Sequence, residues 1–184
     1  MDPVSFAVII GNPRPGSRTA GAAVAAALAV ADAAGLEGEP DVIDLSAYGP
    51  GLLAPEPPSE VADALARVTA ADVLLVASPT YKATYTGLLK VFLDRFAAGA
   101  LTGKIALPLL VVGAPEHALA VEVHLRPLLV ELGADVPSPG LALPESRLDR
   151  PDSLLEEWAG RVAPAVRGAL TAGPSGGRAA GSVR

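Results

Sequence analysis

Two arginines, an asparagine and two hydroxyl side chains cluster in one short segment near the start of the chain. These residues, which lie between an apolar run and a helical pattern, are Asn12, Arg14, Ser17, Arg18 and Thr19. Guanidinium groups bind phosphate through charged hydrogen bonds, and the free N–H groups at a helix N-terminus favour an anion. Ser17 could instead be only the N-cap of the helix, with both arginines in solvent. We favour an anion site, because capping accounts for Ser17 alone.

The spacing of the glycines in this segment narrows the kind of anion. Gly11 and Gly16 are spaced as in a Walker A loop, but Ser17 stands where the lysine belongs and Arg18 where the Mg²⁺-binding hydroxyl belongs. The dinucleotide pattern G-x-G-x-x-G is also absent. The sequence therefore disfavours an NTPase and a Rossmann-type NAD site, and it leaves a monophosphate as the expected ligand.

A second polar segment follows another apolar run. It begins Pro79-Thr80-Tyr81-Lys82, and with Tyr85 it holds two of the three tyrosines of the chain. An aromatic or backbone wall at the end of a strand could lie beside a flat heterocycle. The tyrosines could equally pack beneath the loop, and the residues alone leave both interpretations open.

The sequence gives little support for thiol chemistry, a metal site or a nucleophilic serine. The chain has no cysteine, and its two histidines, His117 and His124, are seven residues apart on an expected helix, which is too far to bind one metal ion. We expect surface or interface histidines and no metal site. The segment Gly173–Gly177 matches a nucleophile-elbow pattern but follows no strand, so we expect no catalytic side chain there.

The elements that must position these segments alternate regularly. The expected strands are Val4–Ile10, Asp41–Leu45, Asp72–Ala77, Ile105–Val112 and Gly140–Leu143. The expected helices are Arg18–Ala34, Ser59–Ala71 with Ser59 as N-cap, Thr86–Ala98, Pro115–Leu132 with a kink at Pro127, and Pro151–Leu170.

Strands that alternate with helices predict a doubly wound α/β fold. We expect a five-stranded parallel sheet of order 2-1-3-4-5 between two helical layers, with ligands at the carboxyl ends of the strands. The fourth strand can hold Pro108 only if that position is at an edge or irregular.

Length and composition indicate the domain organisation and the class of protein. The chain has 184 residues, of which 51% are hydrophobic and 18% charged, and a net charge of −6. We expect one domain over residues 1–171 and a disordered Gly/Ala/Arg-rich tail over residues 172–184. The acidic balance disfavours nucleic acid, and the chain shows no basic leader or membrane segment. We therefore expect a soluble, cytoplasmic protein.

Taken together, three stretches resemble the NADPH-dependent FMN reductase family of the flavodoxin-like fold. The chain is most similar to the branch that supplies reduced FMN to alkanesulfonate-type two-component monooxygenases. The stretches are Gly11–Thr19, Ser78–Asp94 and Gly103–Leu129, within a match from Val4 to Gly133. Asn12 stands where the family usually has Ser, and Ala114 where it usually has a second Gly.

The resemblance implies roles for the polar segments. Asn12, Arg14, Ser17, Arg18 and Thr19 would hold the FMN phosphate, and Pro79, Thr80, Tyr81, Lys82, Gly113 and Ala114 would border the ring. The implied reaction passes a hydride from NADPH or NADH to FMN and demands no protein base. We expect FMN to be an exchangeable substrate that leaves reduced for a partner monooxygenase.

The resemblance also implies a homodimer or homotetramer. We expect its interface to include the stripe of Leu88, Leu89, Phe92 and Phe96 and the helix around Leu119–Leu129. Three alternatives remain: a quinone or azo reductase with tightly bound FMN, a flavodoxin-like electron carrier, and a module without flavin that binds a partner.

Overall fold

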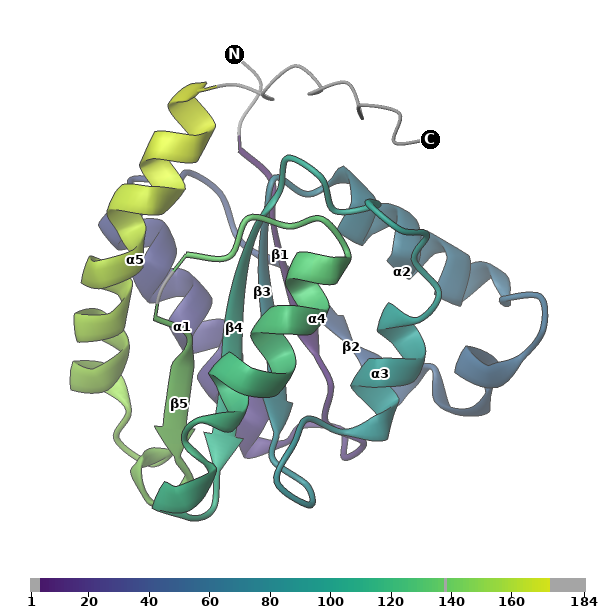
Figure 1. Ribbon diagram of the computed structural model, residues 1–184, viewed down its shortest axis with the longest axis horizontal. Helices are drawn as coiled ribbons and strands as arrows, with labels where there is room; N and C mark the ends of the chain where they lie inside the picture. Colours follow the sequence, from purple (N-terminus) through teal and green to yellow (C-terminus); the bar gives the residue numbers. More distant parts are fainter. Residues whose placement is uncertain (1–3, 138, 173–184) are drawn as a thin grey trace, which may run out of the picture.

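A five-stranded parallel sheet forms the centre of the computed structural model, which describes residues 4–137 and 139–172. Its strands are β1 (Phe6–Ile10), β2 (Asp41–Asp44), β3 (Val73–Pro79), β4 (Ile105–Val112) and β5 (Leu141–Pro144). Their order is β2-β1-β3-β4-β5, and every neighbouring pair is parallel. The predicted topology is confirmed. All carboxyl ends therefore point to one edge, the lower one in Figure 1.

Helices cover both faces of the sheet. They are α1 (Arg18–Ala34), α2 (Ser59–Ala70), α3 (Gly87–Leu93), α4 (Arg126–Glu131) and α5 (Asp152–Ala172). Figure 1 shows α1 and α5 on one face and the other three helices on the opposite face. Two separate apolar clusters fill these layers, and every residue of β1, β3 and β4 is buried. Burial on both faces explains why these strands are unbroken apolar runs in the sequence.

Helix α1 has the predicted bounds because both of its ends carry strong signals. The Ser17 side chain accepts a hydrogen bond from the N–H of Ala20, and Gly35 ends the helix at a φ of 69°. The buried face of α1 consists mostly of alanines, which allow α5 to pack closely against it. This packing fixes the start of α1 at the carboxyl edge of the sheet.

Pro108 lies in β4, between β3 and β5. Alternate residues of a parallel strand face opposite neighbours, and Ala106 donates its N–H to Asp135 on the β5 side. Pro108, two residues later, faces the same side, where β5 begins to pair only at Leu109. The missing N–H therefore faces a local edge, as predicted.

Strand β3 continues two residues beyond the predicted end at Ala77. The expected end was wrong, because Pro79 pairs with Val111 in the ladder to β4. Thr80 donates its N–H to Val111, so the nitrogen of Pro79 faces the β1 side, beyond the end of β1 at Ile10. No ladder hydrogen bond is lost there.

Several helix boundaries also differ from the predictions, and α5 runs over Asp152–Ala172 instead of Pro151–Leu170. Ser59 is the first residue of α2 and not its N-cap, which is Pro58 without a side-chain hydrogen bond. Helix α3 ends at Leu93 instead of Ala98, and beyond it the Arg95 side chain donates to the carbonyl oxygen of Leu52 at 2.8 Å.

The segment predicted as one helix from Pro115 to Leu132 is divided. A 3₁₀ turn, η3 (Pro115–His117), precedes a π-helical turn, η4 (Val121–Leu125), and only then does α4 begin. Pro127 follows the π-helical turn without a break in the helical backbone, and the N–H of Arg126 before it bonds to Val121, so the irregularity expected at this proline takes the form of a π turn. His117 and His124 therefore do not share the face of one regular helix.

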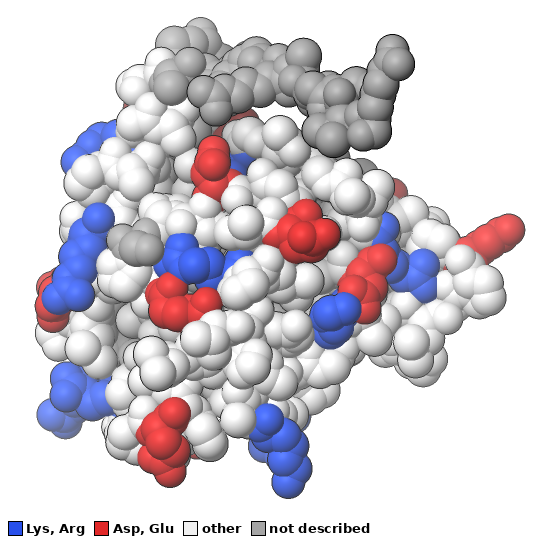
Figure 2. All heavy atoms as spheres, in the orientation of Figure 1, with Lys and Arg blue, Asp and Glu red and all other residues white. Residues whose placement is uncertain are grey.

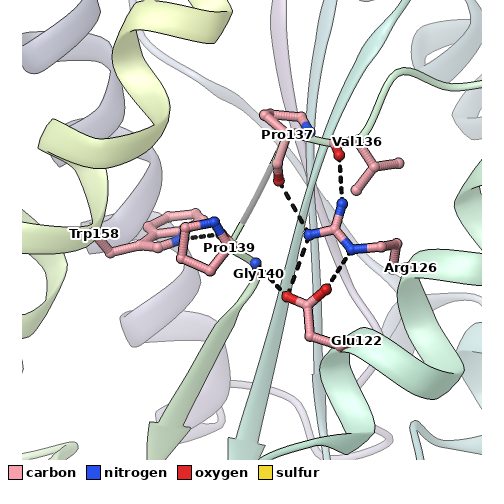
Figure 3. A network of polar contacts seen from close by, with 7 residues as sticks. All are labelled: Glu122, Arg126, Val136, Pro137, Pro139, Gly140 and Trp158. Carbon is pink, nitrogen blue, oxygen red and sulfur yellow. Dashed lines mark hydrogen bonds and ion pairs between the residues drawn. The ribbon is translucent and has the colours of Figure 1, made fainter.

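The π-helical turn is tied to the segment that leads into β5 (Figure 3). The Arg126 guanidinium donates to both Glu122 carboxylate oxygens and to the carbonyl oxygens of Val136 and Pro137. The same carboxylate accepts the N–H of Gly140 at 2.7 Å. The ion pair and these hydrogen bonds hold the pKa of Glu122 below its usual value, with Arg126 as the largest cause.

On the face of the molecule shown in Figure 2, acidic and basic side chains intermingle among uncharged residues. None of the helices in the described ranges is long and apolar enough to cross a membrane. The expected tail begins at the last residue of α5, and residues 173–184, with the elbow-like Gly173–Gly177, lie outside the described residues.

A Glu122→Gln variant is expected to lose about 1 kcal/mol of unfolding free energy at neutral pH, because the ion pair with Arg126 is partly shielded from water. A carboxyl whose folded pKa is lowered stabilises the fold above its unfolded pKa of about 4.3, and this contribution disappears as pH falls through the folded value. Urea unfolding of both proteins at several pH values measures the difference.

Glu157→Gln is the matched control, since Glu157 forms the same i, i+4 pair with Arg161 on the exposed side of α5. We expect it to change stability by about 0.5 kcal/mol or less. Equal losses in the two variants, or a difference from wild type that persists in acid, would contradict the role given to Glu122.

Candidate functional site

A cavity of about 350 Å³ lies at the carboxyl edge of the sheet. It is lined by Asn12, Arg14, Pro15, Gly16, Ser17, Arg18, Thr19, Pro79, Thr80, Tyr81, Val111, Gly113, Glu145 and Leu148. The loops after β1, β3, β4 and β5 all contribute. This is the place where a doubly wound sheet binds ligands.

Asn12 organises the first loop from a buried position. Its Nδ2 donates to Thr19 Oγ1 at 3.1 Å, and its Oδ1 accepts the N–H of Arg14 at 3.0 Å. These bonds close the loop over the first turn of α1. Asn12 therefore shapes the loop, whereas the Thr19 hydroxyl, which accepts from Asn12, keeps its own proton to donate.

The N-terminus of α1 faces the cavity with its donors. The Ser17 hydroxyl oxygen caps Ala20, so the hydroxyl proton is available to a ligand. The first N–H groups of a helix have no intrahelical acceptor, and the helix dipole adds partial positive charge there. Capping and anion binding are thus compatible roles for Ser17, not alternatives.

The two arginines of this loop differ in their surroundings. Arg18 forms an ion pair of 2.6 Å with Glu145, which follows β5 directly. Among the described residues, Arg14 takes part in no ion pair. Sequence reasoning missed Glu145, because it placed the site in the loops after the first, third and fourth strands alone. The carboxyl end of β5 lies at the same edge and was the available signal.

The loop after β3 forms a tight turn beside the cavity. Tyr81 and Thr84 bond to each other through their backbones, and Lys82 and Ala83 between them have φ values of 52° and 66°. Non-glycine residues at such angles store strain, which is concentrated at functional sites. Tyr81 is exposed at the cavity, where it could lie beside a flat ligand. Tyr85 is partly buried and packs against the core.

Thr80 carries a polar atom without a partner. Its Oγ1 is buried and has no hydrogen bond to any residue in the described ranges, although Thr80 lines the cavity. A buried hydroxyl without a partner is unfavourable by about 1–3 kcal/mol. A ligand with polar edge atoms would satisfy it, which fits a flavin ring.

A neighbouring hollow of about 250 Å³ shares Gly113 and Glu145 with the cavity. Ala114 lines this second hollow and not the first, and Lys82 lines neither. Nine of the eleven predicted site residues thus surround one cavity. Their contact with FMN remains a prediction, as do roles for Ala114 and Lys82.

The donor set suits a phosphate attached to a flat heterocycle. Arginines and hydroxyls gather on the α1 side of the cavity, and Thr80 and Tyr81 border the other side. No group of three possible metal ligands occurs in the part of the chain that the structure describes. A further cavity of about 350 Å³ lies at the amino-terminal edge of the sheet, but Glu37, Glu39 and Asp41 line it beside its single arginine, so it lacks a comparable donor set.

The sequence model of the NADPH-dependent FMN reductase family matches residues 4–147. A solved apo structure titled NADH:FMN oxidoreductase (EMOB) has a TM-score of 0.80 and 31% identity, and the match covers 94% of this chain and 92% of that one.

Two curated relatives match over shorter stretches. FMN reductase (NADPH) of Escherichia coli K12 is 50% identical over 64 residues, which cover 35% of this chain and 34% of that protein. NADH-dependent FMN reductase SfnF of Pseudomonas fluorescens Pf0-1 is 38% identical over 80 residues, or 44% of this chain and 43% of that protein. The chain therefore spans about a third to less than a half of the curated relatives it matches.

An Asn12→Ala variant is expected to lose about 1–2 kcal/mol of stability, because two hydrogen bonds of a buried side chain disappear. Asn12→Ser, which keeps a short polar group, is expected to recover part of this loss. Thermal unfolding of the three proteins gives the comparison, and an alanine variant as stable as wild type would show that Asn12 does not hold the loop.

Proposed function

Because this chain belongs to the NADPH-dependent FMN reductase family, we propose that it transfers a hydride from NADPH or NADH to FMN. With one proton from solvent, the products are oxidised nicotinamide nucleotide and reduced FMN. The flavin supplies the hydride-accepting chemistry, and the residues of this chain bind and orient the two reactants. This division agrees with a cavity rich in donors for an anion.

The observation that carries the proposal is the meeting of two donor sets in one cavity. Arg14, Ser17, Arg18 and Thr19 would hold the phosphate with charge-assisted hydrogen bonds. Pro79, Thr80, Tyr81 and Gly113 would border the ring, and Thr80 Oγ1 would gain the partner that it lacks.

We further propose that FMN exchanges as a substrate and leaves reduced for a partner flavin-dependent monooxygenase. Tyr81 is the one aromatic side chain that lines the cavity within the described ranges, so the ring would be stacked on one side at most. An additional aromatic pair would contribute about 0.5–1.5 kcal/mol beyond the buried area. A weakly enclosed ring favours release.

The purified protein, dialysed without flavin, is expected to oxidise NADPH or NADH only when FMN is added. Arg18→Ala is expected to weaken FMN binding by about 10- to 150-fold, the equivalent of one charge-assisted hydrogen bond, and to leave riboflavin binding nearly unchanged. Steady-state absorbance at 340 nm follows turnover, and quenching of flavin fluorescence follows binding.

Arg161→Ala is the control, because Arg161 lies on α5 and does not line the cavity. Equal weakening of FMN and riboflavin in Arg18→Ala would exclude phosphate recognition by this loop. A yellow protein that retains stoichiometric FMN through dialysis would favour a quinone or azo reductase, and FMN binding without NAD(P)H oxidation would favour an electron carrier.

We also propose a homo-oligomer whose interface keeps the expected Leu119–Leu129 segment but not the buried part of the expected stripe. Leu89 and Phe92 are fully buried against the sheet and cannot contact another chain. Leu119, Val123 and Val130 instead expose 70%, 56% and 54% of their surfaces along the η3–α4 segment. Exposed apolar surface of this kind marks an interface, and a second copy of this chain is its proposed occupant.

Val123→Asp is expected to shift the protein towards a monomer, because a charge would be buried at the interface. Light scattering at micromolar concentration should give a multiple of 18.4 kDa for wild type and a smaller mass for the variant. Leu53→Asp, at an equally exposed leucine before α2, should leave the mass unchanged. A monomeric wild type would overturn the proposal.

A further inference from the structure

An acidic side chain stands among the donors that would bind the FMN phosphate. Glu145 follows β5 directly and lines the same cavity as Arg14, Ser17 and Arg18. One carboxylate oxygen accepts a hydrogen bond of 2.6 Å from Arg18. The other lies 3.7 Å from the position that a Cβ on Gly113 would take, so the carboxylate is placed between the first loop and the loop after β4.

This ion pair is a poor candidate for a structural role. The side chains of Arg18 and Glu145 are 59% and 53% exposed, and ion pairs this open to solvent contribute little to stability. The two residues are 127 positions apart in the chain, and α1 has no acidic residue of its own in its first turn. The carboxylate is thus brought to the anion site from the end of the edge strand, β5.

A bound phosphate and the Glu145 carboxylate would compete for the Arg18 guanidinium. Both accept hydrogen bonds from the same guanidinium, and phosphate monoesters carry between one and two negative charges at neutral pH. When phosphate binds, Glu145 either gives up its bond to Arg18 or remains beside a like charge. Both outcomes weaken binding of the phosphate and leave a ligand without phosphate unaffected.

We propose that Glu145 is an internal competitor for Arg18 that sets the affinity and lifetime of bound FMN. The proposal rests on the proposed function, in which FMN must bind and then leave. Glu145 pairs with Arg18 when FMN is absent, and the ion pair forms again as the phosphate leaves. The residue touches no reacting atom and tunes exchange, not hydride transfer.

The test is titration of FMN and of riboflavin into wild type, Glu145→Gln and Glu145→Asp, followed by quenching of flavin fluorescence. Glutamine keeps the size and an acceptor oxygen but removes the charge. We expect Glu145→Gln to bind FMN about 3- to 10-fold more tightly and to release it more slowly, a Coulombic effect reduced by solvent exposure. Riboflavin affinity should stay within about 2-fold, and Glu145→Asp should bind FMN like wild type.

Glu157→Gln is the matched control, because it neutralises a glutamate in an ion pair of similar exposure that does not line the cavity. It should leave both affinities unchanged. The advantage of Glu145→Gln should shrink when salt is raised from about 0.05 to 0.5 M, since salt screens exposed charges.

The outcomes distinguish this proposal from the proposed phosphate site on which it rests. If wild type prefers FMN to riboflavin but Glu145→Gln binds FMN equally or more weakly, Glu145 does not compete and this inference is overturned while the phosphate site stands. Equal tightening for riboflavin would also overturn it, because the effect would then not involve the phosphate. If wild type itself does not distinguish FMN from riboflavin, the phosphate site fails, and this inference fails with it.

Discussion

A single buried hydroxyl, that of Thr86, joins two of the loops that form the cavity, those after β1 and β3. It donates to the carbonyl oxygen of Gly11 and accepts from the N–H of Leu89, while the Thr86 N–H donates to Ser78 Oγ at 3.0 Å. This contact brings α3 so close that a Cβ on Gly11 would lie 2.6 Å from that of Leu89. The end of β1 and the start of α3 are therefore fixed together. A site held in this way needs little reordering when a ligand binds.

The parts of the fold that depend on burial could be predicted from the sequence. Strands covered on both faces must be continuous apolar runs, which is why Ile105–Val112 was placed correctly. Helix α1 has a capping serine at one end and a glycine with positive φ at the other, so its bounds were also visible. Once the order of the sheet is known, its carboxyl edge places Ser17 and Thr80 near each other. Nine predicted site residues meet there because topology, not local sequence, brings them together.

The features that the sequence did not predict depend on contacts between neighbouring elements, which local sequence patterns do not indicate. A π-helical turn adds only one residue to one turn of a helix, a change too small to show in the apolar pattern around Val121. Pro79 is tolerated because of where β1 ends, which is a property of the neighbouring strand. The pairing of Arg18 with Glu145 joins residues 127 positions apart, and only the assembled sheet reveals it.

An anion site this rich in donors raises a problem for any protein that must release its ligand. Charge-assisted hydrogen bonds from Arg14, Ser17, Arg18 and Thr19 would all favour the bound state, before any contact with the ring is counted. A group within the site that opposes phosphate binding would therefore speed release. The Glu145 carboxylate is placed to do this without altering the loop that binds the phosphate, because it pairs with Arg18 from the far end of the chain, after β5.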